Sequence, residues 1–544
     1  MRAFKTGGEI RIDGGYLHRE SIKEIEGRRY DAINKVWYIP LNEKNAALMQ
    51  LLGVELCEEL RATLKAQTAL AREGYVQPTM RLPIRASPYQ HQIAAFNYAL
   101  GIFDSGRRGV ALFADMGTGK TLITIAVAGT LNAAGKVKRL LVVCPKSIVG
   151  VWSAEFCKFA GFDYAAAVLE GSTAKKADTL RHIGVGGGLQ VVIVNYESAW
   201  RLEAELLKFD ADMIVCDESS KIKTAQAQQS KVMHRLGAAA RFKMLLTGTP
   251  ITNNPQDFFS QYKFADAEIF GLSYYSYMRR YTIPGGYGNR QIIGYKNMAE
   301  LVEKAHSIAF RIKLEDAVDL PEKIDEIRSL ELEPNAKKIY QSIDQESYAE
   351  LMQGEVTTRN ILTRLLRLSQ CTGGYIRNDE GGLAQEVSRA KLDALEDILD
   401  ECGSQKVVIF ARFIPEIEAI EKLLKKRNVK YSVIHGGITD RAEQVAQFQN
   451  DSDCRVFIGQ LQTTSMGLTL TAANVAVFYS LDFSFANYEQ SRARIHRIGQ
   501  TQKCLYIHLV AKGTVDEQVM SALKTKGDIA RLMVDDYKKI SGGS

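Results

Sequence analysis

The stretch Val110–Thr121, with the sequence VALFADMGTGKT, decides the fold of this 544-residue chain. An apolar run ends at Ala114, a loop containing two glycines follows, and a helical pattern begins after Thr121. A strand, a glycine-rich loop and a helix in this order let backbone amides at a helix N-terminus surround phosphate oxygens. The stretch therefore predicts a phosphate-binding loop in an α/β fold, although Ala114 stands where the usual pattern begins with glycine.

Each residue of this loop has a predicted role in holding ATP. Gly117, Thr118 and Gly119 shape the loop so that its amides face the phosphates. Lys120 supplies positive charge to the β- and γ-phosphates, and the hydroxyl of Thr121 ligates Mg²⁺. Because so short a match also arises by chance, a second feature is needed before it identifies a site.

That second feature is a pair of carboxylates, Asp217 and Glu218, which follow another apolar run in Val215–Ser220 (VCDESS). Ligands of open parallel sheets bind beyond the carboxyl ends of the strands, where this pair is expected to lie. Asp217 is predicted to hold Mg²⁺, directly or through water, and Glu218 to orient the water that attacks the γ-phosphate. Alone, these letters would be typical of an acidic helix cap. After a phosphate loop, the catalytic interpretation is favoured.

Short, wholly apolar runs alternate with helical patterns along the chain, which is typical of parallel sheets buried on both faces. One series precedes residue 220 and a second follows residue 400, and together they comprise Val110–Ala114, Leu140–Cys144, Val191–Val194, Met213–Cys216, Val407–Phe410, Tyr431–Ile434, Val456–Ile458 and Val475–Tyr479. We predict an α/β protein with two such lobes, at residues 83–325 and 326–544, the second ending in a helical tail. A small α+β accessory domain is predicted at residues 1–82.

Composition favours an intracellular globular protein. Hydrophobic residues make up 46% and charged residues 24% of the chain, and the net charge of +7 permits a polyanionic partner. The eight cysteines include no C-x-x-C pair, which favours reduced thiols over a zinc site. No apolar stretch approaches the ~20 residues of a membrane span, and the N-terminus lacks the apolar core of a secretion signal. We expect a cytoplasmic protein that does not bind membranes.

Two arginines near the end of the chain, Arg494 and Arg497, lie three residues apart in Gln490–Gln500 (QSRARIHRIGQ). On a helix this spacing places both side chains on one face. Because they belong to the second lobe, we predict that they act as arginine fingers, which stabilise transition-state charge when the lobes close around ATP. A charged helix surface is the alternative, which the full phrase disfavours.

These phrases, in this order between about residues 84 and 520, resemble the motifs of the Swi/Snf-type ATPases of helicase superfamily two, which are motors that move along duplex DNA. Further phrases that carry the resemblance are Pro88–Gln90, Val143–Ser147, Asn195–Glu197, Leu246–Pro250, Val408–Phe413, His435–Gly437 and Thr464–Leu470. The resemblance implies two RecA-like lobes that bind ATP and Mg²⁺. It also departs at one point, because Ser220 stands where the family usually has His, and this leaves the coupling of hydrolysis to movement open.

The resemblance assigns further residues to ligands. Gln90 is expected to contact adenine and Gly467 to lie at the nucleotide. Contacts with nucleic acid are implied for Lys146, Ser147, Trp152, Arg412 and Thr464. Since such contacts touch the backbone rather than base edges, little sequence specificity is expected.

Within that family the chain most resembles the annealing-helicase (HARP-like) branch, as a compact bacterial or phage-type member. Arg29–Asp31 and Trp37–Leu41 resemble the small accessory module that those proteins carry before the motor. This implies that residues 1–82 bind DNA with Trp37 as a contact, although a tryptophan in a small sheet is equally expected in a core. The stretch Leu51–Ala71 is expected to be helical.

We therefore expect a monomeric, ATP-dependent DNA translocase or helicase that moves on duplex, forked or partly melted DNA and remodels or re-anneals it in replication, repair or recombination. An RNA helicase of the same superfamily and a catalytically silent nucleic-acid-binding scaffold are the alternatives. The aromatic and basic stretch Tyr274–Tyr295 is either a contact for exposed bases or a packed surface excursion.

Overall fold

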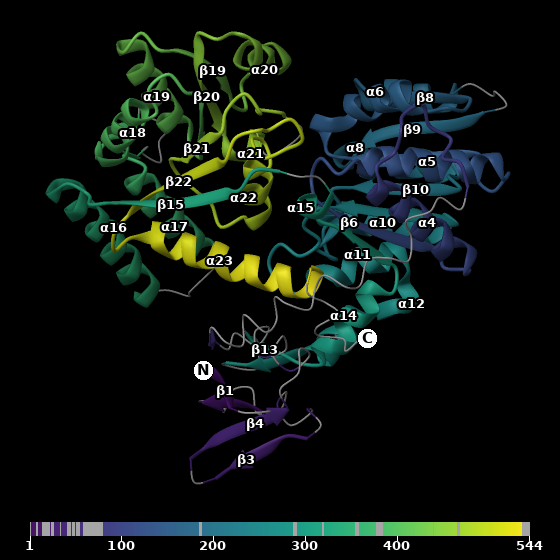
Figure 1. Ribbon diagram of the computed structural model, residues 1–544, viewed down its shortest axis with the longest axis horizontal. Coiled ribbons are helices and arrows are strands. Elements are labelled where there is room, and N and C mark those ends of the chain that lie inside the picture. The colour runs from purple at the N-terminus through teal and green to yellow at the C-terminus, as the bar shows by residue number, and fades with distance from the viewer. Residues whose placement is uncertain are drawn as a thin grey trace. The chain divides into compact units, whose positions relative to one another are not determined.

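The computed structural model describes residues 2–6, 9–13, 22, 25, 27–32, 34–40, 45, 49, 55–57, 80–183, 188–286, 291–317, 320–353, 358–376, 384–438, 440–464 and 468–535. The chain divides into two compact units, the first made of residues 1–317 with 527–544 and the second of residues 318–526 (Figure 1). Each unit contains a parallel sheet flanked by helices. The predicted α/β fold class is confirmed.

A seven-stranded parallel sheet, in the order β14-β6-β11-β10-β7-β9-β8, forms the centre of the first unit. Its strands are β6 (Gly109–Ala114), β7 (Arg139–Cys144), β8 (Tyr164–Val168), β9 (Leu189–Asn195), β10 (Met213–Asp217), β11 (Phe242–Thr247) and β14 (Ala309–Ile312). All four apolar runs predicted as strands in this half are strands. The order places β6 and β10, which precede the phosphate loop and the paired carboxylates, on either side of β11.

Helices cover both faces of this sheet, which is why its strands are apolar throughout. One hydrophobic core receives Val110, Leu112 and Ala114 of β6, and the other receives Ala111 and Phe113. The first core is closed by α4 (Gln90–Asp104), α5 (Lys120–Ala133) and α6 (Val149–Phe159). The second is closed by α8 (Tyr196–Arg201), α9 (Glu203–Phe209), α10 (Gln228–Ala239), α11 (Asp257–Ala265) and α14 (Met298–His306). The unit also contains η1 (Lys146–Ile148), α7 (Thr173–Arg181), η2 (Ser219–Ile222) and α15 (Leu314–Ala317).

Between α11 and α14 the chain makes a small excursion from the sheet. It contains α12 (Ala267–Phe270), α13 (Tyr274–Tyr281) and a two-stranded antiparallel ribbon of β12 (Thr282–Gly285) and β13 (Gln291–Tyr295). The buried rings of Tyr277 and Tyr281 hold α13 against Phe270, with ring centroids 5.3 and 6.0 Å from it. One face of α13 is therefore anchored in the second core.

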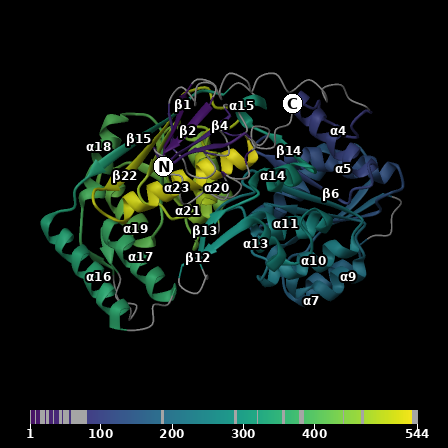
Figure 2. The same ribbon diagram turned by 90° about the horizontal axis from the view of Figure 1, so that it is seen from below.

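The second unit contains a six-stranded parallel sheet in the order β15-β22-β21-β18-β20-β19. Its strands are β15 (Lys323–Leu330), β18 (Val407–Ala411), β19 (Lys430–Ile434), β20 (Cys454–Gln460), β21 (Val475–Phe478) and β22 (Cys504–Ala511). The other elements are α16 (Pro334–Gln353), α17 (Thr358–Thr372), β16 (Tyr375–Ile376), β17 (Gln385–Glu386), α18 (Ala390–Glu401), α19 (Ile414–Lys426), α20 (Arg441–Asn450), α21 (Leu461–Thr464) and α22 (Phe485–Arg492). Helices α16 and α17 pack side by side (Figure 2). The four apolar runs predicted in this half are also strands.

The final helix, α23 (Val515–Val534), belongs to both units. Its first half packs Val515, Val519 and Leu523 into a core of the second unit. The part that begins at Gly527 belongs to the first unit, whose core contains Met533 and Val534. The first unit is therefore completed by residues from the end of the sequence.

A five-stranded sheet lies at the N-terminus, in the order β3-β4-β2-β1-β5, with β1 (Arg2–Thr6), β2 (Glu9–Asp13), β3 (Arg29–Asp31), β4 (Val36–Pro40) and β5 (Glu55–Leu56). Strand β5 pairs in parallel with β1. The helical prediction for Leu51–Ala71 is wrong at this strand, because its backbone hydrogen bonds go to β1, and otherwise lies outside the described residues. In the described part of the chain, every helix is too short or too polar to cross a lipid bilayer.

Candidate active site

The phosphate loop connects β6 to α5 through two glycines with left-handed backbones. Gly117 has φ of 85°, and Gly119, the residue before the first turn of α5, has φ of 87°. A side chain on Gly119 would be strained in this conformation and would overlap the amide of Gln92. The loop thus leads directly into a helix N-terminus, where unpaired N–H groups favour an anion.

Two neighbouring residues that the sequence analysis missed support this loop from the start of α4. The carbonyl of Thr118 accepts a hydrogen bond from Nε2 of Gln92 at 3.2 Å and lies 2.9 Å from Nε2 of His91. Burial lowers the pKa of His91, so the ring is neutral and donates its N–H to this carbonyl. Gln90, the predicted adenine contact, is exposed at the first position of α4. His91 and Gln92 could have been found from the sequence by their position directly after Gln90, in the first turn of α4.

The base of the loop is linked to a partly buried arginine, Arg311. Nζ of Lys120 donates to the carbonyls of Ala114 at 2.7 Å and Asp115 at 3.3 Å. The carboxylate of Asp115 accepts from Nη1 of Arg311 at 2.6 Å, and Nε of Arg311 donates to Asp535. Burial of Arg311 acts to lower its pKa, but the two carboxylates outweigh it and raise the pKa, so the guanidinium stays charged. Asp535 follows α23, so the end of the sequence supports the phosphate loop.

Asp217 lies at the carboxyl end of β10 and is 6% exposed. Its Oδ2 accepts from the indole Nε1 of Trp152 at 2.8 Å, and its Oδ1 accepts from the amide of Glu218 at 2.9 Å. Burial raises the pKa of Asp217, while the charge of Lys120 and these two donors oppose that rise. A nearby cation would stabilise the ionised carboxylate.

Trp152 corrects a prediction made from the resemblance. Its side chain is 1% exposed and packs from α6 into the first core, so it does not present a surface to nucleic acid. Its indole instead orients the Asp217 carboxylate across the sheet edge. The pairing joins residues 65 positions apart, which is why the sequence did not show it.

Glu218 has a left-handed backbone, with φ of 50° and ψ of 56°. A conformation of this kind costs a non-glycine residue about 1–3 kcal/mol and occurs where the surrounding structure enforces it, often at functional sites. The next residue, Ser219, donates to Oε1 of Gln261 at 2.7 Å, and Nε2 of Gln261 donates to the carbonyl of Pro250 at 2.7 Å. Gln261 thus links the paired carboxylates to the end of Leu246–Pro250. Ser220 is half-buried in η2.

The two arginines of the second unit do not share a helix face as predicted. Helix α22 ends at Arg492, and both residues lie in turns beyond it. Arg494 is 2% exposed and donates to the carbonyls of Gln490 at 2.8 Å and Leu468 at 2.9 Å. Arg497 is partly exposed and donates to Oγ1 of Thr469 at 3.0 Å, with the Leu468 carbonyl at 3.4 Å. The turns still bring both side chains to Leu468.

The predicted nucleic-acid contacts have different surroundings. Lys146 and Ser147 are exposed in η1, beyond the carboxyl end of β7. Arg412 is partly buried after β18, with its guanidinium 4.8 Å from the ring centroid of Phe413, and burial lowers its pKa. Thr464 ends α21, and its side chain is not described, whereas Gly467 lies outside the described residues.

Trp37, the predicted contact in the N-terminal sheet, is partly buried and packs against the hydrophobic cluster of that sheet. In the pairing register it shares a face with Ile12 and Tyr30. The opposite face carries a row of Phe4, Arg11, Tyr38 and Arg29 across four strands. The guanidinium of Arg29 lies 4.2 Å from the ring centroid of Tyr38.

Comparison with protein families decides what kind of chain this is. Residues 89–373 match the SNF2-related domain, and residues 390–499 match the helicase conserved C-terminal domain. The chain belongs to the SNF2-related family. The two matches fall largely on the two sheets in turn, so the residues discussed above are those of an SNF2-related protein.

Relatives of this SNF2-related chain include proteins named for DNA repair. A DNA repair and recombination protein RAD54-like from Danio rerio is 26% identical over 488 residues, which cover 80% of this chain and 66% of the relative. The DNA repair and recombination protein RDH54 of Saccharomyces cerevisiae is 26% identical over 488 residues, covering 80% and 50%. The chain spans about half to two thirds of the length of these relatives. A solved Sulfolobus solfataricus SWI2/SNF2 ATPase core in complex with dsDNA gives a TM-score of 0.42 at 25% identity, covering 85% of this chain and 99% of that one.

The donor set of this SNF2-related site fits a hydrated Mg²⁺ shared with a nucleotide. No group of three or more His, Cys, Asp or Glu side chains that could hold a metal occurs among the described residues. Asp217 supplies one carboxylate and Thr121 one hydroxyl, while Mg²⁺ commonly takes its remaining ligands from water and substrate phosphates. Bound there, Mg²⁺ would neutralise charge on the phosphates. The first unit thus presents a glycine-rich loop at a helix N-terminus and a pair of carboxylates, Asp217 and Glu218, at the carboxyl edge of the same sheet.

Proposed function

We propose that this chain is a DNA-dependent ATPase that uses ATP hydrolysis to move along duplex or forked DNA. The proposal rests on one observation. The phosphate loop, the buried Asp217 and the strained Glu218 all lie at the carboxyl edge of the same sheet. The relatives named for DNA repair and recombination support DNA as the partner. The exposed Lys146 and Ser147 support a backbone contact at the same edge of the sheet.

Hydrolysis follows from the roles of these residues. The loop amides and Lys120 bind the β- and γ-phosphates of ATP, and Asp217 and Thr121 hold Mg²⁺. Glu218 orients the attacking water. Arg497 of the second unit supplies positive charge to the transition state, because it is the more exposed arginine of the pair. Arg494, fixed by two carbonyls, positions the turn that carries Arg497.

Movement requires that hydrolysis change the grip on DNA. Hydrogen bonds from Ser219 to Gln261 and from Gln261 to Pro250 connect the paired carboxylates with the segment after β11. A change at Glu218 on loss of the γ-phosphate would therefore shift this segment within the first unit. Lys146 and Ser147 contact the DNA backbone from one lobe, and Arg412 and Thr464 contact it from the other. Closing and opening of the lobes would then move one set of contacts along the DNA relative to the other set.

The proposal extends to an annealing-helicase activity in which residues 1–82 form an accessory DNA-binding domain before lobes 83–325 and 326–544. The row of Phe4, Arg11, Tyr38 and Arg29 supports this, because aromatic and basic side chains on an open sheet face suit single-stranded nucleic acid. The face of Trp37 is partly occupied by packing. Tyr38→Ala is therefore expected to weaken fork binding more than Trp37→Phe does.

The test is ATP turnover in the presence of duplex DNA, forked DNA, single-stranded DNA and duplex RNA, followed by a strand-annealing assay. Duplex or forked DNA should stimulate turnover most, and Lys120→Ala and Glu218→Gln should abolish the stimulated rate while the thermal unfolding curve stays cooperative. Stimulation by RNA alone would show an RNA helicase. Folded protein with no turnover on any nucleic acid would show a silent scaffold.

A further inference from the structure

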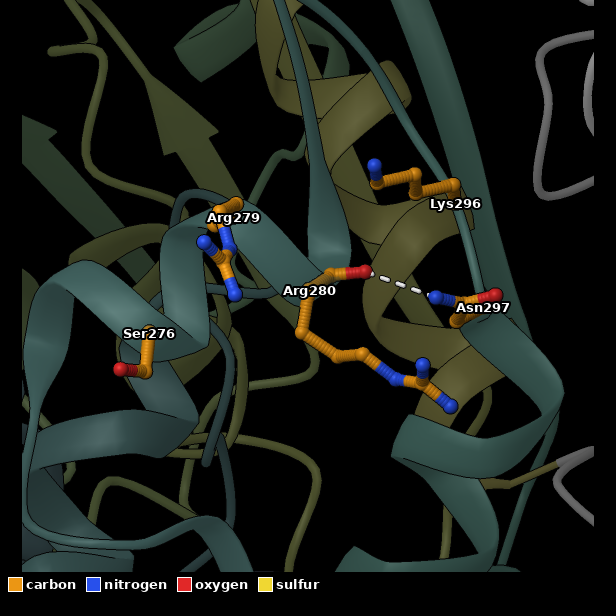
Figure 3. A pocket seen from close by; sticks show the side chains of 5 residues that line it. All are labelled: Ser276, Arg279, Arg280, Lys296 and Asn297. Atoms are coloured by element: carbon orange, nitrogen blue, oxygen red, sulfur yellow. Dashed lines mark hydrogen bonds between the residues drawn. The ribbon is translucent and has the colours of Figure 1, made fainter.

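A basic cavity of about 320 Å³ lies in the excursion between α11 and α14, away from the phosphate loop in the sequence (Figure 3). It is lined by Ser276, Arg279, Arg280, Lys296 and Asn297. The first three come from α13, and the last two from the turn between β13 and α14. Figure 3 shows that the side chains of Arg279 and Arg280 leave α13 in different directions.

Only one of the three cations of this cavity is neutralised by a described carboxylate. Nε of Arg280 donates to Glu300 at 3.0 Å, and Glu300 also accepts from Lys304 at 2.9 Å and from the hydroxyl of Tyr281 at 3.1 Å. Burial acts to raise the pKa of Glu300, but these three donors together lower it to about 2. Glu300 is thus committed to its own partners. Among the described residues, no carboxylate pairs with Arg279 or Lys296.

The backbone holds the two remaining cations in place. Asn297 has a left-handed conformation with φ of 52°, and its Nδ2 donates to the carbonyl of Arg280 at 2.8 Å. The amide of Lys296 donates to the carbonyl of Tyr281 at 3.0 Å. The turn that carries Lys296 is therefore tied to the end of the helix that carries Arg279. These two hydrogen bonds fix the turn of Lys296 against the end of α13, so Arg279 and Lys296 line one cavity, where an anion would meet both positive charges.

Two apolar side chains are exposed in the same excursion. Tyr275, one helical turn before Arg279, is 75% exposed, and Ile293 of β13 is 56% exposed. A free phosphate would gain nothing from such neighbours, whereas an unpaired base stacks on an exposed ring. A nucleic-acid strand offers both a phosphate and a base.

We propose that this cavity is a second DNA contact, in which Arg279 and Lys296 bind a backbone phosphate and Tyr275 stacks on an unpaired base next to it. The contact rests on the proposed function, since it assigns DNA as the partner. It suits a junction where a duplex meets a single strand, because an unpaired base there lies next to the backbone phosphates of the duplex. Phosphate contacts position the DNA without reading its sequence.

The experiment measures binding directly by fluorescence anisotropy, with a labelled fork and a labelled blunt duplex, over a range of salt concentrations. The variant is Arg279→Ala with Lys296→Ala, and the control is Lys208→Ala with Lys231→Ala, which removes the same charge from exposed positions of α9 and α10. The double variant should bind the fork about tenfold more weakly than the control variant. Its log–log salt slope should fall by about 1 in magnitude, as expected for one lost phosphate contact.

Tyr275→Ala separates the two halves of the contact. It should weaken binding to the fork at least threefold and leave binding to the blunt duplex within twofold of the parent protein. Equal affinities of the Arg279/Lys296 variant and its charge-matched control would overturn the phosphate site, and equal loss on fork and duplex would overturn base stacking. Failure of the proposed function is read separately, as absence of DNA-stimulated ATP turnover in the parent protein.

Discussion

Replacing Trp152 by Phe removes one hydrogen bond from the candidate metal ligand and keeps most of the packing. The indole donates to Oδ2 of Asp217 at 2.8 Å, and both residues are buried. A hydrogen bond to a charged group contributes about 1.5–3 kcal/mol, and loss of a partner that orients a metal ligand costs about 10–100-fold in metal affinity or activity. The Mg²⁺ concentration for half-maximal ATP turnover should therefore rise at least tenfold.

The same substitution should change the pH dependence of turnover. Burial already raises the pKa of Asp217, and the indole opposes that rise, so Trp152→Phe should raise the pKa further. Since the ionised carboxylate is the form that holds Mg²⁺, the acidic limb of the pH–rate profile should move to higher pH. Trp200→Phe, at an exposed tryptophan of α8 in the same unit, is the matched control. A Trp152→Phe protein with the parent's Mg²⁺ requirement and acidic limb would refute the assignment of Asp217.

Three further substitutions test the conformation of the phosphate loop, the ion pairs of Arg311 and the protonation of Glu416. Gly119→Ala should weaken binding of a fluorescent ATP analogue more than tenfold, whereas Gly135→Ala, which has φ of 67° and open space around it, should lose only about 1–2 kcal/mol of stability in urea. Arg311→Ala should cost about 1.5–3 kcal/mol, the range for a hydrogen bond to a charged group, because it removes the guanidinium that joins the partly exposed carboxylates of Asp115 and Asp535; Asp535→Asn should cost less. Burial raises the pKa of Glu416 to about 7, so the contribution of this side chain to folding stability is lost as pH rises through 7. Glu416→Gln should therefore be more stable than the parent protein at pH 8, by up to about 3 kcal/mol. Below pH 4.5 the stabilities of the variant and the parent should converge.

Each of these has an outcome that counts against it. Equal nucleotide affinity in Gly119→Ala and Gly135→Ala would mean that the loop does not require the left-handed residue. Coincident denaturation curves for Arg311→Ala and the parent would show that Arg311 does not stabilise the fold around the phosphate loop. A difference in stability between Glu416→Gln and the parent that does not change between pH 4 and pH 8 would show that the fold leaves the pKa of Glu416 at its ordinary value.

The sheets could be predicted because most of their strands are buried on both faces and read as continuous apolar runs. Strand β15, with the sequence KIDEIRSL, gives no such signal, since it lies at the sheet edge and leaves Ile324 and Ile327 exposed. Strand β5 is two residues long and forms only through pairing with β1. Such strands depend on a neighbour elsewhere in the chain, and local sequence does not contain that neighbour.

The candidate site divides in the same way. Asp217 ends β10, Glu218 follows it, and Lys120 begins the helix after the glycine loop, so local patterns place all three. Trp152 meets Asp217, and Arg311 meets Asp115, only through the fold, across 65 and 196 residues. These partners cannot be inferred from spacing.

The spacing of Arg494 and Arg497 misled because it was read as helical. The segment turns instead, where the side-chain amide of Gln500 donates to the carbonyls of Ile495 and Ala473. A side chain that satisfies a backbone carbonyl removes the partner that a helix would need. The structure therefore reaches the same juxtaposition at Leu468 through turns.

Because the last part of α23 belongs to the first unit, the order of synthesis affects the order of folding. Arg311 and Asp535 are 224 residues apart, so the whole second sheet is synthesised before Asp535 can pair with Arg311 in the first unit. Until then, the core of the first unit lacks the side chain of Met533, and Nε2 of His306 lacks the Met533 carbonyl. A nascent chain would therefore hold an unfinished ATP-binding half throughout synthesis, and would complete it only as the last turns of α23 emerge.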